Sequence, residues 1–166
     1  YIPPCGSYKA HEQHTFDLMA KVQEFLRGTK HVLLLLGESG TGKSLFGQHL
    51  LQRLLGEKQT GEGARIPLFI SLPRTQDPVG DLLPETLQSY GFSSHEIDTL
   101  KQTREWIFIL DAYDEMNQLE NLYVSNALKE WKAKVIISCR SSYLAGIEDY
   151  LQYFIPYEGE KRLRDA

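Results

Sequence analysis

The sequence predicts an α/β fold in which a mostly parallel sheet carries helices on both faces. Four apolar-rich runs have the length of strands, and they occupy residues 32–36, 66–72, 106–110 and 135–139. Continuous apolar runs are typical of strands that are buried on both faces. Segments with apolar residues at helical spacing alternate with these runs, which favours parallel strands joined by crossover helices. A chain of 166 residues is long enough for one domain around one core.

The first predicted elements surround a glycine-rich turn. A helix is expected over residues 12–27, where apolar side chains recur at helical spacing, and Gly28 is expected to end it. The strand over 32–36 follows, then the turn over 37–42. Residues 43–55 repeat the helical spacing, so the pattern predicts a strand, a tight turn and a helix in direct succession.

The middle of the chain contains three further structural signals. Pro67 lies near the start of the strand over 66–72, which suits a strand at the edge of a sheet. The pair Asp77-Pro78 predicts the start of a helix, with an N-cap followed by proline in the first turn. Ser93 and Glu96 have the spacing of a capping box and predict the start of another short helix.

The last two predicted strands end in charged residues. The strand over 106–110 runs into Asp111, and the strand over 135–139 runs into Arg140, with a helix expected between them over 124–131. Ligands of open parallel sheets bind at the carboxyl ends of the strands. We therefore look for function at these strand ends.

The chain is predicted to form one domain over residues 1–166. Residues 1–30 are expected to form an N-terminal segment and helix, and residues 31–157 the core. Residues 158–166 are charged and are expected to be either a frayed tail or the start of a helix.

Composition argues against two classes of partner. The formal net charge is -4, without the basic excess that is typical of nucleic-acid surfaces. No apolar run approaches the roughly 20 residues that span a bilayer. We therefore expect neither nucleic acid nor membrane as a partner.

The cysteines indicate a reducing compartment. Cys5 and Cys139 are too few and too far apart for a disulfide framework or a zinc site. Cys139 falls in an apolar strand and is expected to be a buried thiol. This pattern favours a cytoplasmic location.

The glycine-rich turn carries the most specific chemical signal. It matches the pattern G-x-x-x-x-G-K-S/T between an expected strand and an expected helix. Backbone N–H groups of such a loop point at phosphate oxygens, and the following helix adds the positive end of its dipole. Lys43 supplies a cation to the β- and γ-phosphates, and Ser44 offers a hydroxyl to Mg2+. The expected phosphate-loop residues are Gly37, Glu38, Ser39, Gly40, Thr41, Gly42, Lys43 and Ser44. The sequence thus predicts a P-loop NTPase three-layer sandwich.

Acidic residues follow the strand over 106–110. A carboxylate at the tip of a buried strand requires a positive partner, and beside a phosphate loop that partner is Mg2+. Asp111 is therefore a candidate metal ligand. Asp114 and Glu115 are close enough in sequence to hold a water against a γ-phosphate, and an ordinary solvated first helical turn is the alternative for both.

Arg140 is the candidate that reports the state of the nucleotide. It ends a strand whose carboxyl edge is expected near the γ-phosphate, where a guanidinium distinguishes ATP from ADP. An ordinary surface arginine is the alternative.

Three stretches together resemble the NACHT family, which belongs to the STAND class of signalling ATPases. They are residues 37–46, 107–115 and 135–140. The first stretch is shared by many NTPases. The strand that ends in Asp-Ala-Tyr-Asp-Glu and the strand that ends in Ser-Cys-Arg are more specific, and the resemblance covers roughly residues 1–155.

The resemblance implies roles for the candidate residues. Asp111 is similar to the acid that coordinates Mg2+, together with Ser44, and Asp114 or Glu115 to the hydrolytic acid. Arg140 resembles the first sensor residue of the family.

The resemblance also adds expected nucleotide contacts outside the phosphate loop. The segment that contains Ile2 and Pro3 resembles the stretch that packs near the adenine, and Leu45 directly follows the phosphate loop. The implied ligands are ATP or ADP with Mg2+.

The implied activity is that of a regulatory switch. Members of the family hold ADP when inactive, exchange it for ATP on sensing a signal and then oligomerise. Slow ATP hydrolysis resets the state. The resemblance thus implies self-association and contacts with a winged-helix domain and repeats of the same chain as expected partnerships.

Two departures from the family pattern are visible. Family members usually have Thr or Ser followed by Ser before the sensor arginine, where this chain has Ser138 and Cys139. The chain is also expected to lack the winged-helix domain, whose histidine contacts the β-phosphate of ADP, and the repeat and effector domains.

Other functions remain open at this point. A small-molecule kinase uses the same phosphate loop but needs an arginine-rich lid, and the late arginines Arg162 and Arg164 lie in the charged tail. A nucleotide-bound scaffold with negligible hydrolysis differs from the switch only in rate. A GTPase is disfavoured because the chain has no Asn-Lys-x-Asp sequence.

Overall fold

A computed structural model describes residues 5–6, 16–56, 64–158 and 161–162 of the chain. The strands are β1 (Cys5–Gly6), β2 (Phe16–Asp17), β3 (Val32–Leu36), β4 (Arg65–Ser71), β5 (Glu105–Asp111), β6 (Ala133–Cys139), β7 (Tyr157–Glu158) and β8 (Lys161–Arg162). The α-helices are α1 (Leu18–Arg27), α2 (Lys43–Gly56), α3 (Leu82–Ser89), α4 (Ser94–Thr103), α5 (Leu122–Ser125) and α6 (Ser141–Leu144), and the 3-10 helices are η1 (Leu72–Arg74), η2 (Tyr113–Glu115) and η3 (Tyr150–Tyr153).

The main sheet is parallel, as the sequence predicts. Its strand order is β3-β6-β5-β4, and every pair in it runs parallel. Leu36 at the end of β3 is opposite Cys139, and Ser71 at the end of β4 is opposite Asp111. All four carboxyl ends therefore lie along one edge of the sheet. β6 lies between β3, which precedes the glycine-rich turn, and β5, which ends in Asp111.

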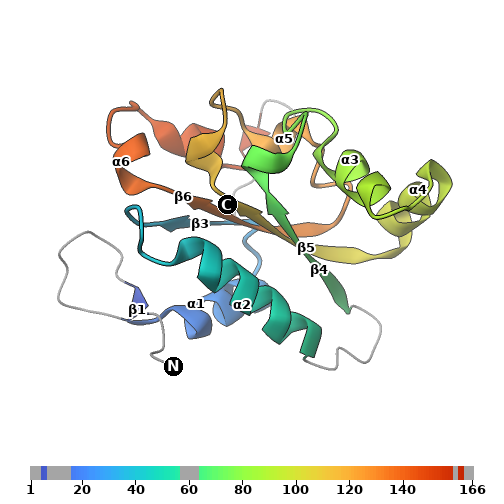
Figure 1. Ribbon diagram of the computed structural model, residues 1–166, viewed down its shortest axis with the longest axis horizontal. Helices are drawn as coiled ribbons and strands as arrows, with labels where there is room; N and C mark the ends of the chain where they lie inside the picture. Colours follow the sequence, from blue (N-terminus) through green and yellow to red (C-terminus); the bar gives the residue numbers. More distant parts are fainter. Residues whose placement is uncertain (1–4, 7–15, 57–63, 159–160, 163–166) are drawn as a thin grey trace.

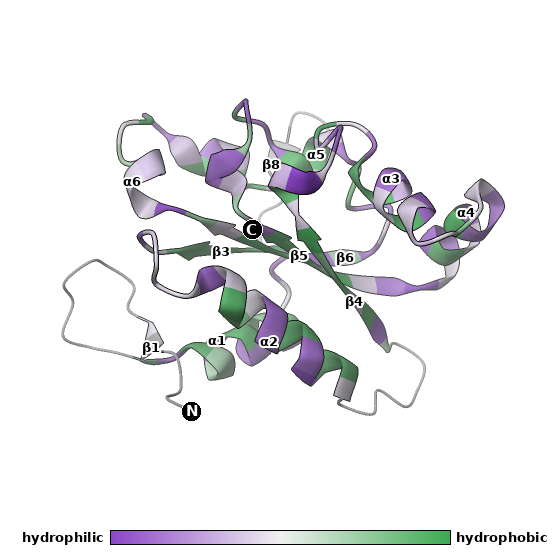
Figure 2. Ribbon diagram, viewed as in Figure 1, coloured by the Kyte–Doolittle hydropathy of each residue, from purple (hydrophilic) through white to green (hydrophobic). Residues whose placement is uncertain are grey.

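Helices cover both faces of this sheet, which makes three layers (Figure 1). α1 and α2 lie on one face, and α3, α4, α5 and α6 lie on the other. Side chains alternate along β5: Ile107 and Ile109 pack with α1 and α2, and Phe108 and Leu110 pack toward the opposite helices. The α/β sandwich is thus confirmed. Figure 2 shows the strands as mostly hydrophobic and the helices as a mixture of hydrophobic and hydrophilic residues.

The position of β3 corrects one expectation. Residues 32–36 were expected to be buried on both faces, but β3 lies at an edge of the described sheet and pairs only with β6. Its first four residues are half-buried, and Leu36 is 39% exposed. The expectation that residues 66–72 suit an edge is confirmed for β4, where Pro67 lies in the outermost strand.

The helix expected to start at Asp77-Pro78 is wrong. Asp77 Oδ1 accepts hydrogen bonds from the N–H groups of Val79 at 3.0 Å and Gly80 at 3.2 Å, which closes a turn instead. Helix α3 begins only at Leu82.

The helix expected over 124–131 is also largely wrong, because α5 ends at Ser125. Ala127 has a φ of 47°, in the left-handed region, so the helix does not continue. The preceding Asn126 is buried and accepts from Leu82 N at 3.1 Å while donating to Pro78 O at 2.9 Å. These long-range bonds to a buried amide compete with the helix.

The first helix is shorter than expected. Of the predicted helix over 12–27, the part from Leu18 is helical, residues 16–17 form β2, and residues 12–15 lie outside the described residues. Asp17 sets the start, because its Oδ1 accepts from Met19 N at 2.8 Å and Ala20 N at 3.2 Å. Gly28 caps the end, as predicted.

Three smaller expectations have clear outcomes. The capping box of Ser93 and Glu96 is confirmed at the start of α4. Cys139 is a buried free thiol, and burial raises its pKa to about 12. Of the charged segment over 158–166, expected to be a frayed tail or a helix start, the described residues are in strands, since Tyr157–Glu158 pairs antiparallel with Lys161–Arg162. No helix in the described part of the chain has the length and apolar character to cross a bilayer.

Gly47 allows α2 to approach the sheet closely. A Cβ atom at this position would lie 2.9 Å from Phe69 Cε2 and 3.2 Å from Ile109 Cγ2. Since β4 and β5 carry those side chains, Gly47 fixes how near the helix that follows the phosphate loop sits to the strand that ends in Asp111.

Gly47→Ala is expected to be less stable than Gly56→Ala by about 1–3 kcal/mol, the typical cost of overpacking. Gly56 is the matched control in the same helix, because a Cβ atom there meets nothing within 4 Å. The difference in unfolding free energy, measured by urea denaturation, checks this. Equal stability of the two variants would contradict the close approach.

Candidate functional site

The glycine-rich loop from Gly37 to Gly42 connects β3 to α2 at the carboxyl edge of the sheet. Gly40 and Gly42 have φ angles of 79° and 85°, a region that side chains disfavour. A Cβ atom at Gly37 would lie 2.8 Å from Thr41 Oγ1. The loop thus depends on glycine at these three positions, and α2 begins as Phe46 N donates to Gly42 O at 2.8 Å.

The loop holds its own lysine. Lys43 Nζ donates to Gly37 O at 2.6 Å and to Glu38 O at 3.0 Å. The hydroxyl of Thr41 donates to the same Glu38 carbonyl at 2.8 Å. The ammonium group is therefore placed at the mouth of the loop by carbonyl groups, which are weaker partners for it than phosphate oxygens are.

The carboxylate of Asp111 is fixed by a hydroxyl from the neighbouring strand. Ser138 Oγ donates to Asp111 Oδ1 at 2.6 Å, and Ser138 Oγ also accepts from Ala112 N at 3.0 Å. Asp111 is only 6% exposed and Ser138 only 5%. Ala112 has a φ of 63°, which turns the chain sharply after the strand. The turn and the hydroxyl together orient a buried carboxylate at the strand end.

Arg140 joins the two acids of η2. Its Nε lies 2.8 Å from Asp114 Oδ2, its Nη2 lies 3.1 Å from Glu115 Oε1, and its backbone N–H donates to Asp114 Oδ1 at 2.9 Å. The side chain of Asp114 is 4% exposed, whereas those of Arg140 and Glu115 are 43% and 48% exposed. The guanidinium thus neutralises a carboxylate that would be costly to bury alone.

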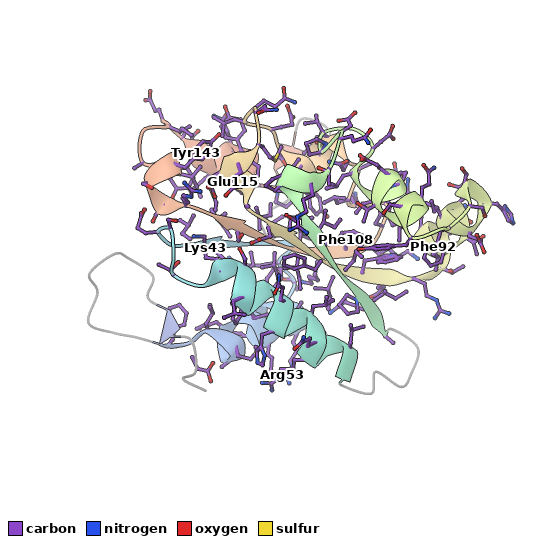
Figure 3. The ribbon with its side chains drawn as sticks, viewed as in Figure 1. Lys43, Arg53, Phe92, Phe108, Glu115 and Tyr143 are labelled. Atoms are coloured by element: carbon purple, nitrogen blue, oxygen red, sulfur yellow. The ribbon has the colours of Figure 1, made fainter. Side chains whose placement is uncertain are left out.

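These groups line one cleft of about 270 Å3. Its lining residues are Ser39, Gly40, Gly42, Lys43, Ser44, Leu45, Asp111, Ala112, Asp114, Glu115, Ser138 and Arg140. The three stretches that resemble the family therefore meet at one place, and Figure 3 shows Lys43 and Glu115 at the same end of the molecule, far from Phe92.

Not every expected residue lines the cleft. Gly37, Glu38 and Thr41 shape the loop from outside the lining. Ile2 and Pro3, expected near the adenine, lie outside the described residues.

The side chain of Glu38 points to the start of α6 instead. Its carboxylate accepts hydrogen bonds from the hydroxyl of Ser141, from Ser142 N at 3.1 Å and from the hydroxyl of Ser142 at 2.8 Å. The hydrogen bond from Ser141, followed by those from Ser142, holds the pKa of this carboxyl below its usual value. Glu38 is therefore ionised at neutral pH.

The cleft suits a nucleotide phosphate chain with Mg2+. A Cβ atom at Gly40 or Gly42 would meet nothing within 4 Å, so the backbone there is open to a ligand. Ser44 and Asp111 supply the hard oxygen donors that Mg2+ prefers. The described residues contain no group of three or more His, Cys, Asp or Glu that could hold a metal. Phosphate and water oxygens would complete the shell of Mg2+, as is usual for this ion.

Fold and site define a nucleotide-binding P-loop NTPase. The family model of the NACHT domain matches residues 31–158, which is more than half of the 166 residues. The chain therefore belongs to the NACHT family. No curated protein matches the chain.

Two contacts of the site were missed from sequence. Ser138 was not among the candidate site residues, yet it orients Asp111, and the available signal was a polar residue near the end of an apolar strand, one position after Ile137, which pairs with Leu110. The bond between Glu38 and the serines after Arg140 left no signal, because it joins residues that are more than one hundred positions apart.

Ser138→Ala is expected to lower the unfolding free energy by about 1–3 kcal/mol, because the buried Asp111 oxygen and Ala112 N–H both lose their partner. Ser89→Ala is the control, since the hydroxyl of Ser89 is exposed and bonds only within its own helix region at Thr86 O. The control should change stability by no more than about 0.5 kcal/mol. Equal losses in urea denaturation would contradict the role of Ser138.

Proposed function

We propose that the chain is an adenine-nucleotide switch that binds ADP or ATP with Mg2+ and hydrolyses ATP slowly. One observation carries the proposal: Arg140 pairs with both Asp114 and Glu115 inside the cleft that the phosphate loop lines. A single guanidinium is thus shared between the acids that would orient a water and the place where a γ-phosphate would lie.

Each residue has a role in this proposal. Backbone N–H groups of the loop and Lys43 bind the β- and γ-phosphates. Ser44 and Asp111 bind Mg2+, which neutralises phosphate charge when bound. Asp114 or Glu115 orients the attacking water, and Leu45 covers the nucleotide at the start of α2, where it is 72% exposed.

The pairing of Arg140 gives a physical reason for slow hydrolysis. Arg140 uses both oxygens of Asp114 and one oxygen, Oε1, of Glu115, and a proton acceptor that is held by a cation accepts a proton from water less readily. A γ-phosphate attracts the guanidinium with up to three oxygens and competes with these carboxylates. ADP has no such group, so the proposed switch separates the two nucleotides by whether Arg140 leaves the acids.

The same ion pairs also favour the second candidate, a scaffold that binds nucleotide with negligible hydrolysis. Single-turnover hydrolysis by Asp114→Asn and Glu115→Gln separates the two. A slower reaction in either variant supports the enzyme, and an unchanged rate in both supports the scaffold.

Membership of the family supports the rest of the proposal. The domain is proposed to act in signal transduction in the cytoplasm as a STAND-class, NLR-like ATPase. Nucleotide exchange would drive self-association and change the contacts with a winged-helix domain and repeats of the same protein.

Adenine-selective binding tests the proposal first. Calorimetric titration with Mg2+ is expected to show binding of ADP and ATP but not GTP, and Lys43→Ala should weaken binding by about 10- to 100-fold, the worth of one charge-assisted hydrogen-bonding group. Lys30→Ala is the control, since Lys30 is exposed and lies outside the cleft lining. Binding of GTP equal to that of ATP, or no loss in Lys43→Ala, would argue against it.

Arg140→Lys tests the sensor. The variant keeps a positive charge beside the buried Asp114 but loses the planar fork that contacts two acids at once. The affinity for a non-hydrolysable ATP analogue is expected to fall about 10-fold or more, with that for ADP nearly constant. Equal losses for both nucleotides would mean that Arg140 does not sense the γ-phosphate.

A further inference from the structure

A hydrogen-bonded bridge joins the phosphate loop to the segment that carries the sensor arginine. We use the name Glu38 bridge for the three hydrogen bonds that the Glu38 carboxylate accepts from Ser141 and Ser142. Both oxygens are used, since Oε1 accepts from the Ser141 hydroxyl and Ser142 N, and Oε2 accepts from the Ser142 hydroxyl. A carboxylate held by three donors is fixed in orientation as well as charge.

The bridge lies beside the cleft and not within it. Neither Glu38 nor the two serines belong to the residues that line the cleft. Any effect of Glu38 on a nucleotide therefore passes through the groups to which it is attached.

Those groups are functional on both sides. On the loop side, the backbone carbonyl of Glu38 accepts from Lys43 Nζ at 3.0 Å and from the Thr41 hydroxyl at 2.8 Å. On the other side, Ser141 directly follows Arg140, whose guanidinium holds Asp114 and Glu115. One residue thus connects the carbonyl that holds the phosphate-binding lysine with the chain that carries the sensor.

The contacts of Lys43 give a reason for the Glu38 peptide to move when phosphate binds. When phosphate takes Lys43 away from the carbonyls of Gly37 and Glu38, the Glu38 peptide loses one of its ties. A second link between the same two segments is the bond from Gly37 N to Cys139 O at 3.3 Å, which is a backbone contact. The Glu38 bridge is the side-chain link that substitution removes without touching the strand pairing.

We propose that Glu38 is a positioning residue that couples the phosphate loop to Arg140 and thereby sets how strongly the site prefers ATP over ADP. This inference rests on the proposed function. Glu38 occupies one of the variable positions of the loop pattern. It is proposed to affect nucleotide discrimination through Ser141 and Ser142, without contacting the nucleotide directly.

The experiment compares Kd values for ADP and for a non-hydrolysable ATP analogue, both with Mg2+, by calorimetry on the whole chain. The variants are Glu38→Ala, the double variant Ser141→Ala/Ser142→Ala, the triple combination and Glu38→Gln. Glu148→Ala is the control, an exposed carboxylate outside the cleft lining. Thermal unfolding confirms that each variant is folded.

Glu38→Ala is expected to lower the preference for the ATP analogue about fivefold or more, the smaller end of typical coupling between sites. The double serine variant should do the same, and the triple variant should add nothing, because all three remove one interaction. Glu38→Gln should restore the preference, since an amide can keep all three contacts: its oxygen accepts two, and its nitrogen donates to the Ser142 hydroxyl. The control should match the wild type.

Several results would overturn the inference. Equal weakening of both nucleotides in Glu38→Ala would mean that the bridge only stiffens the loop. Additive losses in the triple variant, or a Glu38→Gln variant that behaves as Glu38→Ala does, would mean that Glu38 acts by its charge and not through the serines. If the wild-type chain prefers the ATP analogue and Glu38→Ala keeps that preference, the inference is refuted but the proposed function is not. A wild-type chain that binds neither nucleotide refutes the proposed function, and the inference with it.

Discussion

The parallel pairing of β6 between β3 and β5 is the constraint on which the site depends. It sets the glycine-rich loop after β3, Asp111 at the end of β5 and Arg140 after β6 along one edge. The backbone N–H of Gly37 bonds the carbonyl of Cys139, so loop and sensor segment are joined at the strand ends themselves. A shift of one residue in this register would turn Ser138 away from Asp111 and separate the three parts of the cleft.

Charges within the cleft are balanced by partners that a nucleotide can replace. Lys43 is held by carbonyl groups of its own loop, and Arg140 by two carboxylates. Both cations thus lie near the place where phosphate would bind, and each must break its present contacts to reach a phosphate oxygen. Moving Arg140 away costs more than moving Lys43, because it leaves the carboxylate of Asp114 without its cation, and that side chain is only 4% exposed. We therefore expect Arg140 to discriminate between nucleotides more than Lys43 does in the proposed switch.

The sequence predicted the elements whose signal is local. The loop from Gly37 to Ser44, the capping box of Ser93 and the four strands follow from spacing within a few residues, and the family membership follows from the motifs at their ends. Two of the failures have long-range causes. Asn126 bonds Pro78 in the turn before α3 and Leu82 at the start of α3, which ends α5 early, and the edge position of β3 is set by which strands lie beside it. The contacts of Glu38 with Ser141 and Ser142 exist only once β3 and β6 are paired.

The central claim is that the loop and the strand-end residues form one nucleotide site, and a crystal structure of the chain with Mg2+ and a non-hydrolysable ATP analogue tests it most directly. The account predicts phosphates against the loop amides, Lys43 Nζ moved from the Gly37 and Glu38 carbonyls to phosphate oxygens, and Mg2+ beside Ser44 and Asp111. A nucleotide bound elsewhere, or phosphates in the cleft with Lys43 still on its carbonyls and Arg140 still on Asp114 and Glu115, would contradict it.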